Sequence, residues 1–207
     1  FLSYLQKKIF FYDFKEKVKK DYYEINKILK GPSHIFYDKN KNNLLISDYD
    51  GKEVYEFNVS NLSIKKLSNL INVKFEKPHM TIKKNNKYYI LDTKLKKIII
   101  ANKDYDLIGE INQENLLFGN KKKFKNKFFE IPVSIKIDSL HNYYISDVGE
   151  NNCIYIINKN MKLIGIIENN KILKNNNVYN LKNLNLNKIY DLIVTDEDIF
   201  IASTHTH

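Results

Sequence analysis

The chain repeats one pattern three times: GPSHIFYD (31–38), LLISD (44–48) and EVYEF (53–57); KPHMTI (77–82), KYYILD (87–92) and KIIIA (97–101); IPVSIKID (131–138), NYYISD (142–147) and CIYII (153–157). The prolines that mark the copies, Pro32, Pro78 and Pro132, lie 46 and 54 residues apart. In each copy an aspartate closes the second apolar run, 14 to 16 residues after the proline. Self-similarity at a period of this size is typical of a fold that repeats one supersecondary unit.

Each unit is predicted to contain four short β-strands. The apolar residues come in runs rich in Ile, Val, Tyr and Phe, separated by Asn, Asp, Lys and Gly, which is the pattern of strands and turns. The expected strands are 35–37, 44–47, 54–57 and 63–67, then 81–83, 88–91, 98–101 and 107–111, then 134–137, 143–146, 154–157 and 163–167. Four antiparallel strands repeated radially form the blades of a β-propeller. We therefore predict an all-β fold, a β-propeller of four-stranded antiparallel blades.

The repeated pattern also resembles that of a known family. The series Pro-x-x-Ile-x-x-Asp, a hydrophobic pair with Ser-Asp, a short turn and a strand of the form Ile-Tyr-x-Phe/Ile is similar to the NHL repeat of six-bladed propellers. The best copies are residues 31–58 and 131–158. The resemblance implies that about three full blades and two partial ones are present, as part of a six-bladed ring. The YVTN and WD-like propellers, which also have degenerate repeats, are alternatives.

We expect one propeller domain, or a fragment of one, over residues 1–207. Its expected parts are a partial blade (1–30), two blades (31–70 and 71–111), a blade with an inserted loop (112–168) and a second partial blade (169–207). In a closed propeller a terminal strand usually completes the blade at the other end, which removes exposed sheet edges. Because both ends carry second-strand material, we favour a fragment of a larger ring, completed by further chain segments, over a closed ring of four blades.

The charge and the cysteine content narrow the functional classes. The net charge is +10, yet all 34 basic residues are lysine. Arginine is the residue that recognises phosphate and guanine bidentately, so its absence weakens a nucleic-acid function. A chain rich in Lys, Asn, Ile and Tyr indicates an AT-rich genome instead. The single cysteine, Cys153, lies in an apolar run and is predicted to be a buried strand residue rather than a nucleophile.

Nothing in the sequence is typical of a membrane span or a targeting segment. No stretch approaches the roughly 18 apolar residues that a spanning helix needs, and no basic region followed by an apolar block opens the chain.

The expected topology places two sets of loops on one face of the propeller. These are the connections between second and third strands and the connections from each fourth strand to the next unit. The loops are 48–53, 92–96 and 147–152, and the longer inter-blade segments are 68–77, 112–130 and 168–188. Loops on a rigid scaffold are where binding residues are usually found. This loop face is therefore the predicted binding face.

The densest charged patch is the loop 119–129. Its candidate binding residues are Lys121, Lys122, Lys123, Phe124, Lys125, Lys127 and Phe128. Lysines interleaved with aromatic rings are suited to a nucleic-acid backbone with stacked bases, or to an anionic lipid surface. The alternative is a loop whose lysines keep the protein soluble and whose phenylalanines pack beneath the rim.

The repeated aspartates Asp48, Asp92 and Asp147 are predicted to be structural turn residues. A carboxylate at a strand end commonly accepts hydrogen bonds from the amides of the turn, and a catalytic site needs different groups at one place. His34 and His79 follow their prolines by different spacings, so they are expected on opposite sides of their strands. We accordingly predict no catalytic residue, no metal site and no cofactor.

The leading functional hypothesis is a non-catalytic propeller scaffold that mediates protein–protein interaction through its loop face. RNA or polyanion binding through the loop 119–129 is the first alternative. The resemblance to propeller families implies a second, an enzyme of the lyase or lactonase type with a metal in the central channel. No Gly-rich phosphate loop and no Gly-x-Ser-x-Gly or His-Glu-x-x-His motif is present to support catalysis.

Overall fold

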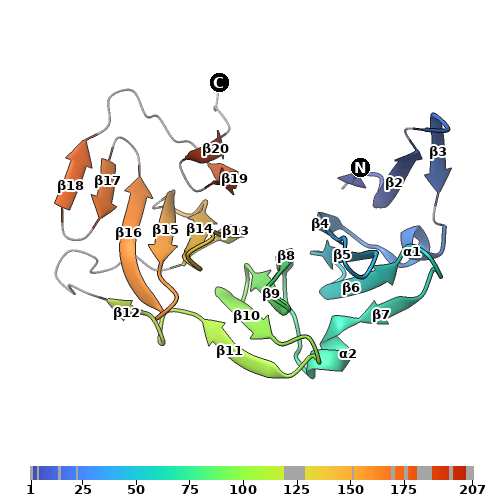
Figure 1. The fold of residues 1–207 in the computed structure, drawn as a ribbon, viewed down its shortest axis with the longest axis horizontal. Helices are drawn as coiled ribbons and strands as arrows, with labels where there is room; N and C mark the ends of the chain where they lie inside the picture. Colours follow the sequence, from blue (N-terminus) through green and yellow to red (C-terminus); the bar gives the residue numbers. More distant parts are fainter. Residues whose placement is uncertain are drawn as a thin grey trace. The chain divides into compact units, whose positions relative to one another are not determined.

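The computed structural model describes residues 2–3, 5–13, 15–21, 23–118, 129–150, 152–168, 171–174, 177–180, 188–195 and 198–203 (Figure 1). By its internal contacts the chain divides into two compact units. Unit 1 comprises Phe1–Leu95 and Ile100–Ile108, and unit 2 comprises Lys96–Ile99 and Gly109–His207.

Unit 1 begins with a three-stranded sheet and a short helix. The strands β1 (Leu2–Ser3), β2 (Lys8–Asp13) and β3 (Val18–Asp21) pair in chain order, and α1 (Tyr23–Ile28) follows. A four-stranded antiparallel sheet comes next. Its strands are β4 (Pro32–Asp38), β5 (Asn43–Asp48), β6 (Glu53–Asn58) and β7 (Ile64–Lys66). They also pair in chain order, as expected when successive strands are joined by hairpins.

A second four-stranded sheet follows helix α2 (Leu67–Ile71). Its strands are β8 (Pro78–Lys84), β9 (Lys87–Asp92), β10 (Lys97–Ala101) and β11 (Leu107–Ile111), again paired in chain order. The boundary between the two units divides β10 and β11, whereas β8 and β9 belong wholly to unit 1.

Unit 2 contains the third repeat in a seven-stranded sheet. Its blade strands are β13 (Pro132–Ile137), β14 (Tyr143–Asp147), β15 (Cys153–Ile157) and β16 (Lys162–Glu168). The hairpin of β17 (Lys171–Lys174) and β18 (Asn177–Asn180) extends this sheet, and β12 (Leu117–Phe118) pairs with β16 in parallel. A two-stranded antiparallel sheet, β19 (Ile189–Val194) and β20 (Ile199–Ser203), ends the described chain.

The predicted all-β fold with four-stranded antiparallel blades is confirmed. Every one of the expected strands overlaps an observed strand, and sheets of three and two strands lie where partial blades were predicted. Two details were wrong. Leu67 begins helix α2 rather than ending a strand, and the segment 168–188, expected as a loop, contains the hairpin β17–β18.

Helix α2 forms because its sequence places two apolar residues on one helical face. Leu67 and Ile71 are four residues apart, and both are buried. Asn72 then adopts a left-handed conformation with φ of 57° and donates its backbone N–H to the carbonyl of Ser68, which ends the helix. The local apolar run at 63–67 therefore serves two elements instead of one.

The structure explains why proline and aspartate recur at a fixed spacing. In the three repeats, Pro32 pairs with Asp48, Pro78 with Asp92 and Pro132 with Asp147 across the first two strands. A bulge follows each pair, since the next register is shifted by one residue. Proline has no N–H to donate and is tolerated where a strand begins or bulges. The strands β19 and β20 have the same shift after Ile189.

Each unit has its own apolar core. In unit 1 one buried cluster consists of Ile9, Ile25, Leu29, Leu44, Ile46, Tyr55 and Phe57. In unit 2 a buried cluster consists of Ile154, Ile156, Ile167, Ile189 and Leu192. Cys153 is fully buried in β15, as predicted. Among the described residues, no helix is long and apolar enough to cross a membrane.

Candidate interaction surface

The repeated aspartates bind backbone amides on both sides of the blade's first hairpin. Asp48 is fully buried, and its carboxylate accepts hydrogen bonds from the backbone N–H groups of Lys30 (3.0 Å) and Gly31 (2.7 Å), just before the proline. It also accepts a bond of 3.3 Å from the N–H of Gly51 in the following turn. The carbonyl of Gly31 in turn accepts the N–H of Asp50.

The other two copies repeat this arrangement. Asp92 accepts bonds from the N–H groups of Glu76 (2.7 Å), Lys77 (3.0 Å), Lys94 (3.1 Å) and Leu95 (3.0 Å). The corresponding donors to Asp147 are the N–H groups of Glu130 (2.7 Å), Ile131 (3.0 Å) and Gly149 (2.9 Å). We call each carboxylate with its amide partners an aspartate clasp. The sequence indicated the turn amides but missed the donors before the proline, 15 to 18 residues away.

The clasp carboxylates are spent on these amides. Burial raises the pKa of Asp147, and the hydrogen bonds from Gly149, Ile131 and Glu130 oppose that rise. Groups held in this way are positioned to fix the backbone rather than to meet a ligand. The structural role predicted for Asp48, Asp92 and Asp147 is in keeping with this geometry and remains a proposal.

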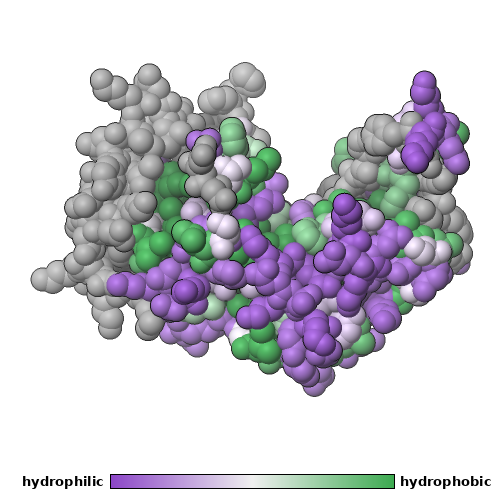
Figure 2. Space-filling view, viewed as in Figure 1, coloured by the Kyte–Doolittle hydropathy of each residue, from purple (hydrophilic) through white to green (hydrophobic). Residues whose placement is uncertain are grey.

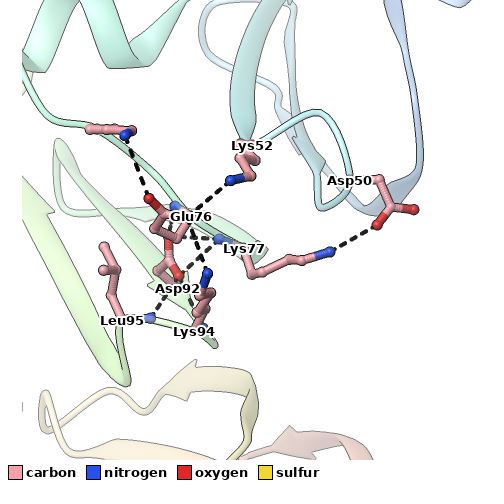
Figure 3. A network of polar contacts seen from close by, with 8 residues as sticks. Asp50, Lys52, Glu76, Lys77, Asp92, Lys94 and Leu95 are labelled. Carbon is pink, nitrogen blue, oxygen red and sulfur yellow. Dashed lines mark hydrogen bonds and ion pairs between the residues drawn. The ribbon is translucent and has the colours of Figure 1, made fainter.

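An ionic network lies beside the Asp92 clasp in unit 1 (Figure 3). The Glu76 carboxylate lies 3.0 Å from Lys52 Nζ, 3.5 Å from Lys94 Nζ and 3.7 Å from Lys74 Nζ. The hydrogen bond and the charge of Lys52 lower the pKa of Glu76. One carboxylate thus gathers three ammonium groups from three separate segments.

Lys77 connects this network to the loop after β5. Its Nζ lies 3.0 Å from Asp50 Oδ1 and 4.2 Å from the centroid of the Tyr49 ring, a cation–π distance. The edge of the His79 ring meets the Tyr49 ring, with the centroids 5.7 Å apart. The loop 48–53 and the segment 72–77, both assigned to the predicted binding face, are therefore in contact in unit 1.

We call this group the lysine surface: Tyr49, Asp50, Lys52, Lys74, Glu76, Lys77 and Lys94. Its four lysines and two carboxylates give it a net charge of +2. The side chain of Lys74 is 84% exposed and that of Lys94 is 63% exposed, whereas that of Glu76 is only 21% exposed. Its ammonium groups are therefore more accessible than its central carboxylate. Figure 2 shows that polar side chains (purple) cover much of the visible surface around helix α2.

A second polar network is buried at the other end of the same strands. Lys83 Nζ lies 2.5 Å from Asp38 Oδ2, both side chains are 8% exposed, and the ammonium lies 5.2 Å from the centroid of the Tyr88 ring. Glu56 accepts hydrogen bonds from Asn43 Nδ2 (2.5 Å) and from the Tyr105 hydroxyl (2.7 Å). The sequence gave no signal for this network, because Lys83 stands in a predicted strand like any solvent-facing lysine.

The tyrosines of this network stay protonated. Burial, followed by the neighbouring Glu56 carboxylate, raises the pKa of Tyr88 and brings that of Tyr105 to about 12. Their rings are stacked with centroids 5.4 Å apart. The network is filled by its own side chains and serves to join the sheets β4–β7 and β8–β11.

Other predicted site residues fall in different places. The loop candidates Lys121, Lys122, Lys123, Phe124, Lys125, Lys127 and Phe128 lie outside the described residues. His34 lies in β4 and His79 in β8, both partly buried. In the part of the chain that the structure describes, no three His, Cys, Asp or Glu residues are grouped so that they could hold a metal ion.

The comparisons with known proteins identify the fold. No family model matches the sequence, and no curated protein matches it. The streptogramin B lyase structure is similar with a TM-score of 0.61 at 11% identity, over 97% of this chain and 70% of that chain. A chain of the nidogen/laminin complex is similar with a TM-score of 0.55 at 11% identity, over 92% and 77%. The WD40 β-propeller domain of Doa1 gives 0.52 at 13% identity, over 84% and 48%.

These likenesses show a β-propeller fold. The chain spans less than half of the Doa1 chain and about three quarters of the other two. Since the similar structures belong to differently named propellers, the fold is shown and the NHL-repeat family is not specifically singled out. Identities of 11 to 13% carry the fold alone.

Proposed function

We propose that the chain is a non-catalytic propeller scaffold that binds another protein through its loop face. The observation that carries this proposal is the lysine surface of unit 1. There, exposed ammonium groups are gathered over a backbone that the Asp48 and Asp92 clasps hold in place. A rigid backbone with accessible charged side chains lowers the entropy lost on binding and favours a partner of opposite charge.

The kind of partner follows from the charge of the surface. Its central carboxylate is largely covered, and the ammonium groups of Lys74 and Lys94 face solvent. An acidic segment of a partner protein can share these ammonium groups with Glu76. Propellers named for interaction, such as the nidogen/laminin complex, have the same fold, which supports a binding role without identifying a partner.

The test compares two charge variants in quantitative co-purification from the native host. Lys52→Gln, Lys74→Gln and Lys94→Gln together neutralise the lysine surface, and Lys39→Gln, Lys65→Gln and Lys87→Gln neutralise three exposed lysines outside it. We expect the first triple variant to lose a protein that the wild type and the second variant retain. Equal recovery of every co-purified protein by both variants would contradict the proposal.

RNA or polyanion binding through the loop 119–129 stays a prediction from the sequence. Its test is the salt dependence of binding to a single-stranded RNA, with Lys121, Lys122, Lys123, Lys125 and Lys127 changed to Gln. The affinity should fall steeply with salt in the wild type and drop in the variant, because neutralised phosphate contacts release fewer counterions.

A further inference from the structure

A cavity of about 500 Å³ lies in unit 2, between the sheet β13–β16 and the strands β19 and β20. Its lining residues are Asp138, Ser139, Leu140, Asn142, Tyr144, Ile156, Ile164, Ile167, Thr195 and Ile199. Leu140 is 73% exposed and marks the open side, whereas Ile156 and Ile167 are buried. Cavities of roughly 300–1,000 Å³ with mostly apolar walls and a few polar groups are typical of small-molecule sites.

The strand registers identify what occupies the same position in unit 1. In both β8 and β19 the register shifts after the first pair, so Lys83, opposite Tyr88, corresponds to Val194, opposite Ile199. On the facing sheets the last residue of the first hairpin strand region is Asp38 in unit 1 and Asp138 in unit 2.

The third strands can be aligned in the same way. Asp48 pairs with Glu53 and Asp147 with Cys153, so Glu56 of β6 corresponds to Ile156 of β15. The unit 1 position is therefore filled by Lys83, Tyr88 and Glu56, with the Tyr105 hydroxyl bound to Glu56. The unit 2 position has Val194, Ile199 and Ile156, which are shorter and apolar, and it contains the cavity.

We propose that the Asp138 cavity binds a small molecule that carries a primary ammonium group on an apolar, aromatic body. Unit 1 shows the chemistry that suits this position, because there the ammonium of Lys83 lies against the Asp38 carboxylate and near an aromatic ring. In unit 2 the bound ammonium lies near Asp138, and the apolar body packs on Ile156, Ile164 and Ile199.

The Asp138 carboxylate is oriented for this role by its neighbours. Oδ1 accepts the backbone N–H of Asn142 at 2.7 Å, and Oδ2 accepts Asn142 Nδ2 at 2.7 Å and the Tyr144 hydroxyl at 3.2 Å. Burial, followed by the charge of Asp138, raises the pKa of Tyr144 to about 12. The phenol is therefore a neutral donor at physiological pH, and the negative charge stays on Asp138 at the cavity wall.

The test measures the affinity of the whole chain for phenethylammonium and for phenethyl alcohol by titration calorimetry. The two probes share one apolar body and differ in charge. We expect phenethylammonium to bind at least about tenfold more tightly, because a buried carboxylate discriminates strongly for an opposite charge. No binding of the amine, or equal binding of amine and alcohol, would overturn the proposal.

Two variants on different strands locate the site. Val194→Lys supplies the side chain that Lys83 provides in unit 1, and we expect it to bring the ratio of the two affinities close to one. Val194→Met, of similar length and uncharged, should keep the preference for the amine. Asp138→Asn should also abolish the preference, with its fold checked by circular dichroism. A preference that survives in Val194→Lys would overturn the proposal even if Asp138→Asn did not fold.

Discussion

Two contacts between neighbouring sheets, one in each unit, use corresponding backbone positions with different side chains. In unit 1 the Ser47 hydroxyl donates to Thr81 Oγ1 at 2.9 Å, and both residues are fully buried. In unit 2 Ser146 is also fully buried, but Leu192 stands at the position of Thr81. Within the described residues the Ser146 hydroxyl has no hydrogen-bond partner.

The polar bonds of the second contact come from elsewhere. Ser134 Oγ donates to Asp191 Oδ1 at 2.6 Å, and Lys136 Nζ lies 3.0 Å from the same oxygen. These bonds lower the pKa of Asp191 against the effect of its burial. The repeat therefore fixes where side chains meet, and their identity decides whether a contact is filled and polar or apolar with a cavity.

The largest effect is expected from breaking the buried ion pair of unit 1. Lys83→Met leaves the Asp38 carboxylate buried without its ammonium, and removal of one partner of a buried pair costs about 3–5 kcal/mol. The free energy of unfolding from urea titration checks this value. The double variant Lys83→Met with Asp38→Asn removes the charge and should recover much of the loss. Equal stability of the single and double variants would contradict the argument.

The next effect concerns the aspartate clasp. Asp92→Ala leaves four backbone N–H groups without their acceptor, and we expect a loss of about 3 kcal/mol because unsatisfied amides near a core are costly. Asp104→Ala is the matched control, since the Asp104 side chain is 62% exposed and its removal should change stability by about 0.5 kcal/mol or less. Similar losses in the two variants would show that the clasp contributes little.

Alkaline pH should weaken both units through their tyrosines. The folded-state pKa of Tyr105 in unit 1 and of Tyr144 in unit 2 is about 12, above the ordinary value of 10.0. Their contribution is fully present below pH 10 and is lost as the pH rises towards 12, because the unfolded chain releases these protons first. Circular dichroism at increasing pH measures the loss, and Tyr105→Phe or Tyr144→Phe should make it less steep. An unchanged pH profile in both variants would contradict this.

The smallest effect separates the two serines. Ser47→Ala removes the hydrogen bond to Thr81 and should cost about 1 kcal/mol. Ser146→Ala removes a buried hydroxyl beside an apolar residue and should change stability little or raise it slightly. Urea unfolding of both variants measures the difference. A larger loss in Ser146→Ala than in Ser47→Ala would reverse this comparison.

The strands could be predicted because each one is a short apolar run with a polar boundary. The elements that were missed lack this signal. Lys171–Lys174 and Asn177–Asn180 begin and end with polar residues and contain only two apolar residues each, so the sequence gave an Asn-rich loop. Helix α2 has five residues, too few for a helical period to be recognised.

The candidate surfaces were harder to predict than the fold. The lysine surface depends on Glu76, and nothing in the local sequence distinguishes this residue from other exposed acids. Its partners Lys52 and Lys94 are 24 and 18 residues away and meet it only after the strands have paired. Likewise, the buried pair of Lys83 with Asp38 joins residues 45 positions apart. Tertiary pairing, rather than residue type, creates both sites.

The aspartate clasp has a consequence for how such a chain can be altered. One carboxylate and a few backbone amides close the end of each first hairpin, so no particular side chain is required on the donor side. Segments that leave the hairpin at its other end, such as residues 39–42, are turn residues that take no part in the clasp. A foreign loop grafted at that turn should leave the clasp closed, which makes the repeat a scaffold for display as well as a natural fold.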